Sequence, residues 1–241
     1  MDNMLKDCKT YYGAIDIGSN AVRLLIKCVE EDEQGKVFFS KVLLLRVPLR
    51  LGFDVFAMGK ISETKEKNML RLMKVFHHLM KIYDVEDYRA CATSAMRDAK
   101  NGKDIIKRIK KKTGIRIEII DGQEEAKMIY NNHIECMEDR NGNYMYVDVG
   151  GGSTEINLLS QGELVCSRSY NIGTVRILNN AVKETEWERL KRICRNWLFL
   201  TPVRTSSVRV ETSTNFIVWP KRKTRKSNEL QWKCCTNCMK A

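Results

Sequence analysis

This chain of 241 residues lacks long apolar runs, and none of its runs approaches the roughly 20 residues that a membrane-spanning helix needs. The first ten residues, MDNMLKDCKT, lack the apolar core of a secretory signal peptide. The nine cysteines lack the paired spacing of a disulfide framework, so we expect reduced thiols. These absences together predict a cytoplasmic protein that makes no membrane contact.

Basic charge is present but unevenly distributed. Residues 191–241 contain 12 Lys or Arg against 2 Asp or Glu, so the first 190 residues carry only +2 of the net charge of +12. The same tail holds three of the four tryptophans, four of the nine cysteines and two of the three prolines. The distribution argues against a nucleic-acid-binding protein and indicates that two different compositions are joined in one chain.

The first half of the sequence predicts a small α/β domain. Apolar β-formers predict strands at Tyr12–Ile17, Val22–Cys28 and 37–49, and residues 50–62 are expected to form a loop. Ser62 is expected to cap a long helix, because apolar residues then recur at spacings of three and four. His77 and His78 have no metal-ligating partner at helical spacing and are expected to be structural.

The pattern continues with alternating strands and helices. A strand is expected at 87–93, a helix start at 94–102, a basic amphipathic helix at 103–114, a strand at 115–120 and a helix at 122–138. Three strands then follow, at 143–149, 153–160 and 164–172. The order predicts an α/β domain followed by the start of a second one. No internal repeat with a fixed period of 20–50 residues is evident.

Two short stretches have the pattern of a ligand-binding turn. AIDIGSN, at 14–20, and YVDVGGGSTEI, at 146–156, each place an aspartate at a strand end before a glycine turn. Glycine within an element costs roughly 0.5–1 kcal/mol relative to alanine, so three in a row suggest close approach to the backbone. Phosphate is the usual candidate, because its oxygens accept hydrogen bonds from bare N–H groups.

Six stretches together resemble the exopolyphosphatase/guanosine pentaphosphatase family. They are AIDIGSNAVRLLI, RLGFDVFAMGKIS, ATSAMRDAKNG, GQEEAKMIY, VDVGGGSTEI and NIGTVRI, and they occur in family order over roughly residues 10–185. The resemblance implies the actin-like ATPase (ribonuclease H-like) superfold, an α/β fold with a complete first domain and an incomplete second one. The expected divisions are 1–122, 123–190 and a non-family tail at 191–241.

The resemblance also implies roles for matching residues. It makes Glu125 the catalytic base that activates the attacking water, and it makes Asp16 and Asp148, with Glu155 nearby, the carboxylates that hold Mg²⁺ or its waters. The implied phosphate contacts are Gly18, Ser19, Asn20, Arg97, Gly150, Gly151, Gly152, Ser153 and Thr154. Ala21 departs from the family, in which many members have serine, and this removes one hydroxyl.

The implied activity is metal-dependent hydrolysis of phosphoanhydride bonds in inorganic polyphosphate or guanosine pentaphosphate. Two alternatives stay open: another phosphotransferase of the superfold, such as a sugar kinase or ATPase, and an inactive remnant whose basic tail binds polyanions. The run KRIKKK at Lys107–Lys112 is either a solvated helix face or a guide for a polyanion. A homodimer is an open alternative, and no nucleic-acid or membrane partner is expected.

The tail departs from the family pattern after about residue 190. Members continue with a GSGGN element that is missing here, but rereading residues 206–223 in a shifted frame can recover it. We therefore interpret the tail as frame-shifted, with a junction around Glu188–Arg195. The chain is then expected to be poorly soluble, weakly active or inactive, and disordered after about residue 190.

Overall fold

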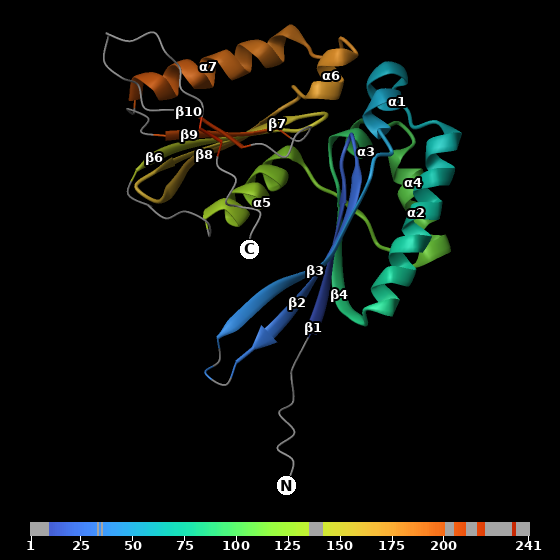
Figure 1. Ribbon diagram of the computed structural model, residues 1–241. Coiled ribbons are helices and arrows are strands. Elements are labelled where there is room, and N and C mark those ends of the chain that lie inside the picture. The colour runs from blue at the N-terminus through green and yellow to red at the C-terminus, as the bar shows by residue number, and fades with distance from the viewer. Residues whose placement is uncertain are drawn as a thin grey trace. The chain divides into compact units, whose positions relative to one another are not determined.

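The computed structural model describes the backbone of residues 10–134 apart from 33 and 35, of 142–200, and of the short strands 205–210, 216–219 and 233–234 (Figure 1). Side chains are described up to residue 130 and from 142 to 196. The chain divides into two compact units. Unit 1 comprises residues 1–92 and 96–119, and unit 2 comprises residues 93–95 and 120–241.

Unit 1 is built on a five-stranded sheet with the order β3-β2-β1-β4-β5. The first three strands pair antiparallel, and β4 and β5 add in parallel on the other side of β1. The strands are β1 Thr10–Ile17, β2 Val22–Glu31, β3 Val37–Val47, β4 Val85–Ala92 and β5 Glu118–Ile119. The strands expected near 12–17, 22–28, 37–49 and 87–93 are therefore confirmed.

The long helix behind Ser62 is also confirmed. It is α2, Glu63–Ile82, and the Ser62 side chain accepts a hydrogen bond from the backbone N–H of Lys65. Its buried residues recur at the predicted spacing and are Met69, Leu72, Met73, Phe76 and Met80. The basic helix α4, Gly102–Thr113, packs on α2 and ends where Gly114 adopts a left-handed conformation, with φ of 77°.

The expected loop at 50–62 is wrong for its first part, because residues Leu51–Met58 form helix α1. Arg50 precedes the helix in the left-handed region, with φ of 51°, and Gly59 ends it with φ of 72°. A helix of eight residues between two such corners has too little length for a clear period of 3.6. Backbone hydrogen bonds to the turn between β1 and β2 stabilise this helix instead.

Unit 2 has a six-stranded sheet with the order β11-β10-β9-β6-β7-β8. Its strands are β6 Asn143–Val149, β7 Thr154–Ser160, β8 Glu163–Tyr170, β9 Thr205–Val210, β10 Phe216–Trp219 and β11 Lys233–Cys234. Its helices are α5 Gly122–Ile134, α6 Thr174–Leu178 and α7 Glu184–Leu200, and α3 Ser94–Asp98 begins at the division between the units.

The sheet of unit 2 is covered on both faces, by α5 on one and α7 on the other (Figure 1). One face is apolar: Ile156, Leu158, Tyr170 and Ile172 form a buried cluster there. Trp187, Leu190 and Ile193 of α7 pack against that cluster. Because side chains alternate along a strand, Glu155 and Asn157 of β7 face the other side, towards α5.

The two units repeat one topology. Each starts with three antiparallel strands, continues with a short and a long helix, and then returns a strand in parallel beside its first strand. In unit 1 these elements are β1–β3, α1, α2 and β4, and in unit 2 they are β6–β8, α6, α7 and β9. The repeat escaped the sequence search because only the two glycine turns remain similar in sequence.

Regular structure continues past the expected division at residue 190, which lies inside α7. The strands β9 to β11 lie in the predicted tail, and the rest of residues 201–241 lies outside the described residues. Among the described residues, no helix is long and apolar enough to span a membrane.

Candidate functional site

The first glycine turn lies between β1 and β2. The Gly18 N–H donates to the Ala21 carbonyl at 3.0 Å, which closes the turn, and Ser19 is buried. Ala21, the departure from the family pattern, is fully buried. Asp16 pairs across the strands with Arg23, whose guanidinium lies 2.7 Å from its carboxylate.

Helix α1 docks on this turn through backbone hydrogen bonds. The N–H groups of Arg50 and Gly52 donate to the carbonyls of Asn20 and Ser19 at 2.8 and 2.7 Å. A Cβ atom at Gly52 would lie 3.1 Å from the Ser19 carbonyl oxygen and 2.8 Å from the ring of Phe56. A side chain at this position would therefore have to displace its neighbours.

The second glycine turn, between β6 and β7, is bound in the same manner by α6. The Gly150 N–H donates to the Ser153 carbonyl at 2.9 Å. The Gly150 carbonyl accepts from the Thr174 N–H at 3.0 Å, and the Gly151 carbonyl accepts from the Val175 N–H at 2.8 Å. The start of α6 thus takes up the carbonyls of the turn.

A buried arginine completes this set. Arg176 is 8% exposed, and its Nε donates to the Gly152 carbonyl at 2.8 Å. Three successive carbonyls, from Gly150 to Gly152, are therefore bound by α6 residues. Since the C=O and N–H of a trans peptide point in opposite directions, the N–H groups from Gly151 to Ser153 point away from α6. Successive N–H groups with a common direction form an anion-binding concavity.

Gly173 makes this approach possible. A Cβ atom there would lie 2.5 Å from backbone atoms of Gly151 and Gly152, which is far inside van der Waals contact. The stretch NIGTVRI contributed to the family resemblance, but the sequence predicted no role for Gly173 or Arg176. The glycine before a helix start was the available signal, whereas nothing in the sequence marks Arg176 as buried.

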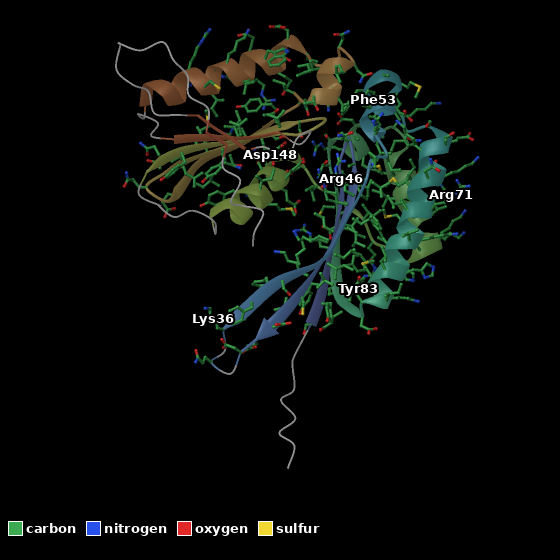
Figure 2. All side chains as sticks on the ribbon, viewed as in Figure 1. Lys36, Arg46, Phe53, Arg71, Tyr83 and Asp148 are labelled. Carbon is green, nitrogen blue, oxygen red and sulfur yellow. The ribbon has the colours of Figure 1, made fainter. Side chains whose placement is uncertain are left out.

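The carboxylates of unit 2 gather on the α5 side of the sheet. Asp148 lies in β6 (Figure 2), and Glu155 of β7 is its direct cross-strand partner. The two side chains therefore share one face of the sheet. Glu155 is 3% exposed and accepts a hydrogen bond from the Ser169 hydroxyl at 2.8 Å. Glu125 is half-buried in the first turn of α5, the helix that covers this face.

The remaining predicted phosphate contacts differ in what their side chains do. The Thr154 hydroxyl donates to the Ile172 carbonyl, so it fixes the end of β8. Ser153 is buried beside it, and Arg97 is half-buried in α3. The structure thus brings Asp16, Gly18, Ser19 and Asn20 together in unit 1. In unit 2 it brings together Asp148, Glu155 and the turn Gly150–Thr154. The roles assigned to these residues stay predictions.

The carboxylates of the site meet the requirements of magnesium only in part. Among the described residues, no three Asp, Glu, His or Cys side chains gather closely enough to hold a metal ion. Mg²⁺ is usually bound by one or two carboxylates together with water and substrate phosphates, so a protein cluster of three is not required. The cross-strand pair of Asp148 and Glu155 fits that requirement, whereas the Arg23 guanidinium competes for Asp16.

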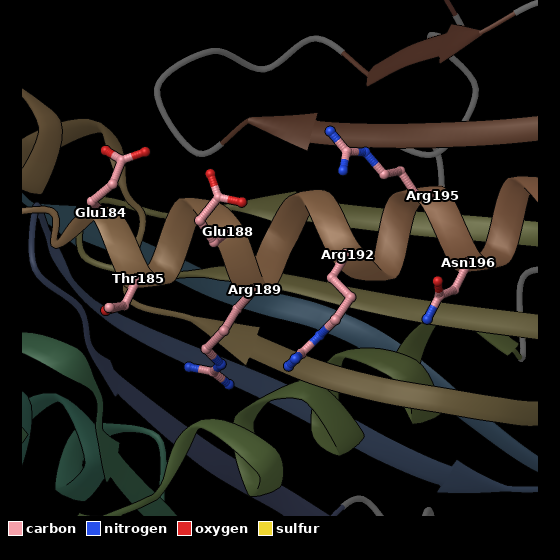
Figure 3. A pocket seen from close by; sticks show the side chains of 7 residues that line it. All are labelled: Glu184, Thr185, Glu188, Arg189, Arg192, Arg195 and Asn196. Atoms are coloured by element: carbon pink, nitrogen blue, oxygen red, sulfur yellow. The ribbon is translucent and has the colours of Figure 1, made fainter.

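A pocket of about 650 Å³ lies along the solvent side of α7 (Figure 3). Its lining residues are Glu184, Thr185, Glu188, Arg189, Arg192, Arg195 and Asn196. They belong to one exposed helix face, and none is a predicted site residue. Beneath this face, burial raises the pKa of the Tyr170 hydroxyl to about 12, a shift that Cys166 reinforces.

The sequence matches the profile of a known protein family. The Ppx/GppA phosphatase family profile matches residues 28–201, well over half of the chain. This chain belongs to the Ppx/GppA phosphatase family. The match extends beyond the expected end of the family region at about residue 190, and it confirms the family resemblance seen in the sequence.

Two relatives match most of this chain but less than half of their own length. A bifunctional 3-dehydroquinate synthase/phosphatase of Fusobacterium nucleatum is 32% identical over 194 residues, covering 77% of this chain and 29% of that protein. A guanosine-5'-triphosphate,3'-diphosphate pyrophosphatase of Aeromonas hydrophila is 29% identical over 170 residues, covering 70% of this chain and 33% of that one.

The fold agrees with that of a solved structure. The crystal structure of an exopolyphosphatase from Cytophaga hutchinsonii matches with a TM-score of 0.64 and 27% identity, covering 71% of this chain and 53% of that one. The expected α/β fold is therefore confirmed. The chain spans between 29% and 53% of the length of these three relatives.

Proposed function

We propose that the chain hydrolyses phosphoanhydride bonds and releases phosphate from inorganic polyphosphate or from a guanosine pentaphosphate. The observation that carries this proposal is the orientation of the Gly151–Ser153 amides, which share a direction because α6 binds the carbonyls behind them. Oriented amides suit the oxygens of a phosphoryl group, and phosphoryl transfer depends mainly on positioning and charge neutralisation. The names of the exopolyphosphatase and pyrophosphatase relatives support the same substrate class.

In the proposed reaction, Glu125 accepts a proton from water as the water oxygen attacks the terminal phosphorus. The bond between that phosphorus and the bridging oxygen breaks, and the shortened substrate leaves with the bridging oxygen. The turn amides bind the non-bridging oxygens throughout. Asp148 and Glu155 would hold Mg²⁺, which would supply additional neutralisation of phosphate charge when it is bound.

Replacement of Glu125 tests this assignment. We expect Glu125→Gln to lower kcat for phosphate release at least a hundredfold, because the amide cannot accept the proton, with KM changed little. Glu124→Gln is the matched control, since it removes the same charge one residue away on α5. Phosphate release should be measured with long-chain polyphosphate, tripolyphosphate and guanosine pentaphosphate. Equal loss in both variants would remove Glu125 from the mechanism.

The tail is proposed to be frame-shifted, as the composition after residue 190 suggests. The family match to residue 201 supports a junction later than Glu188–Arg195. Resequencing of the coding DNA is the direct test. A second test compares phosphate release from this chain and from a version in which residues 206–223 are read in the shifted frame. If the tail impairs the enzyme, the second version should be more active.

A further inference from the structure

The interface between α5 and the sheet of unit 2 is unusual in its polarity. Helices normally cover a sheet with apolar contacts, as α7 does on the opposite face. Beneath α5, β7 and β8 instead present four polar side chains, with Glu155 and Asn157 next to Ser167 and Ser169, beside the buried Leu159. Buried polar groups cost free energy unless they form hydrogen bonds. The presence of polar side chains in this layer therefore has to be explained.

Asn157 is the most buried member of this layer, at 1% exposure. Its Nδ2 donates to the Ala126 carbonyl at 3.1 Å, immediately after Glu125 in the sequence. Among the described side chains, its Oδ1 has no hydrogen-bond partner, and neither has the hydroxyl of its cross-strand neighbour Ser167. An apolar residue of similar shape would avoid that cost, so stability alone does not explain an asparagine here.

Two further contacts fix the same turn of α5. Asp121 caps the helix, since its carboxylate accepts from the N–H groups of Gln123 and Glu124 at 2.8 Å each. A Cβ atom at Gly122 would lie 2.6 Å from the Ser169 side chain, so the helix start lies directly on β8. Ser169 in turn donates to Glu155. The turn carrying Glu125 is therefore held at both strands beneath it.

We propose that Asn157 is a positioning residue for Glu125, acting through the backbone of α5. The inference rests on the proposed function, because it assigns Asn157 to the orientation of the proposed general base. The Asn157 amide fixes the rotation of the helix turn about its own axis, and the rotation sets where the Glu125 carboxylate lies. General-base catalysis requires the carboxylate to be within hydrogen-bond reach of the attacking water.

The first test is hydrogen exchange of the full chain, which does not depend on activity. Asn157→Leu removes the tie to Ala126 while keeping the shape of the side chain, and the Ala126 carbonyl keeps its place in the helix. We expect amides in residues 122–130 to exchange about tenfold faster, with α2 unchanged. Ile156→Val is the matched control, because Ile156 is buried on the opposite face of the same strand. Unchanged exchange in Asn157→Leu would overturn the proposal.

The second test separates positioning from simple structural support. Asn157→Leu should lower kcat about tenfold or more without changing KM. Asn157→Asp should also move the acidic limb of the kcat–pH profile to higher pH, because an additional carboxylate beneath α5, beside Glu155, disfavours ionisation of the base. A structural role would lower the melting temperature and leave that limb in place. Faster exchange with unchanged kcat and an unmoved limb would therefore overturn the proposal.

The two proposals can fail separately. If the wild-type chain and the frame-restored chain release no phosphate from any of the three substrates, the proposed function fails. The exchange measurement still decides whether Asn157 holds α5 in that case. If wild type is active and exchange is unchanged, the function stands and the assignment of Asn157 falls.

Discussion

The two glycine turns of this chain occupy equivalent places in a repeated topology. They differ in how many of their carbonyl groups are bound by the helix that follows. In unit 1, α1 takes up two carbonyls, those of Ser19 and Asn20. In unit 2, α6 takes up three, and the third depends on the buried side chain of Arg176. The second turn therefore presents a longer row of amides in one direction. A helix start can therefore shape a glycine turn from behind, by binding its carbonyl groups.

The largest difference between the turns should appear when their docking glycines are replaced. Gly173→Ala places a Cβ 2.5 Å from backbone that cannot move aside. We expect it to reduce the free energy of unfolding by about 3 kcal/mol and to abolish phosphate release. Denaturant unfolding and a phosphate assay would measure this. A variant with wild-type stability and activity would show that α6 does not shape the turn.

Gly52→Ala should have a smaller effect in unit 1. Its closest contact, at 2.8 Å, is the ring of Phe56, which can rotate, and the Ser19 backbone lies farther away at 3.1 Å. We expect a loss of about 1 kcal/mol, measured in the same unfolding experiment. A loss equal to that of Gly173→Ala would mean that the two turns are docked with equal tightness, contrary to the comparison.

Replacement of Arg176 removes the third carbonyl contact. Arg176→Met keeps the apolar stem and loses the bond to Gly152, for an expected cost of about 2 kcal/mol and a clear fall in kcat. Arg192→Met, on the exposed face of α7, is the control and should change neither quantity. Calorimetry and steady-state kinetics would distinguish the two variants.

The smallest effect concerns acid stability. The pKa of Glu186 lies below its ordinary value of 4.5. Burial alone would raise this pKa, but hydrogen bonds from the Asn171 N–H and the Arg189 guanidinium stabilise the carboxylate and outweigh the effect of burial. A lowered folded-state pKa means that the contribution is complete above pH 4.5 and is lost as pH falls through the folded value. Glu186→Gln should thus unfold with a weaker pH dependence below 4.5. Exposed Glu163→Gln should unfold like wild type.

Local patterns in the sequence predicted most of unit 1. The capping by Ser62, the apolar period along α2 and the glycine after α4 are interactions between residues close in sequence, and each was found at its expected place. Helix α1 was missed because its stability comes from the Ser19 and Asn20 carbonyls, about 30 residues earlier in the chain. Contacts of that range leave no periodic signal.

The candidate site was also predictable only as far as local motifs allow. The aspartates and glycine turns were visible as motifs, and the structure shows Asp148 and Glu155 as cross-strand partners. The carbonyl contacts of α6, the burial of Arg176 and the polar layer around Asn157 depend on the packing of separate elements. An arginine or asparagine in a sequence gives no indication of such burial, because both residues are usually exposed.

The orientation of the Gly151–Ser153 peptides has a consequence for conditions in solution. Peptide N–H groups are neutral, so the affinity that they provide for an anion is not weakened by dissolved electrolyte as strongly as attraction to lysine side chains is. Under the proposed function, raising ionic strength should therefore weaken any attraction of a polyanion to the exposed lysines of α4 more than the binding of a terminal phosphoryl group at this turn.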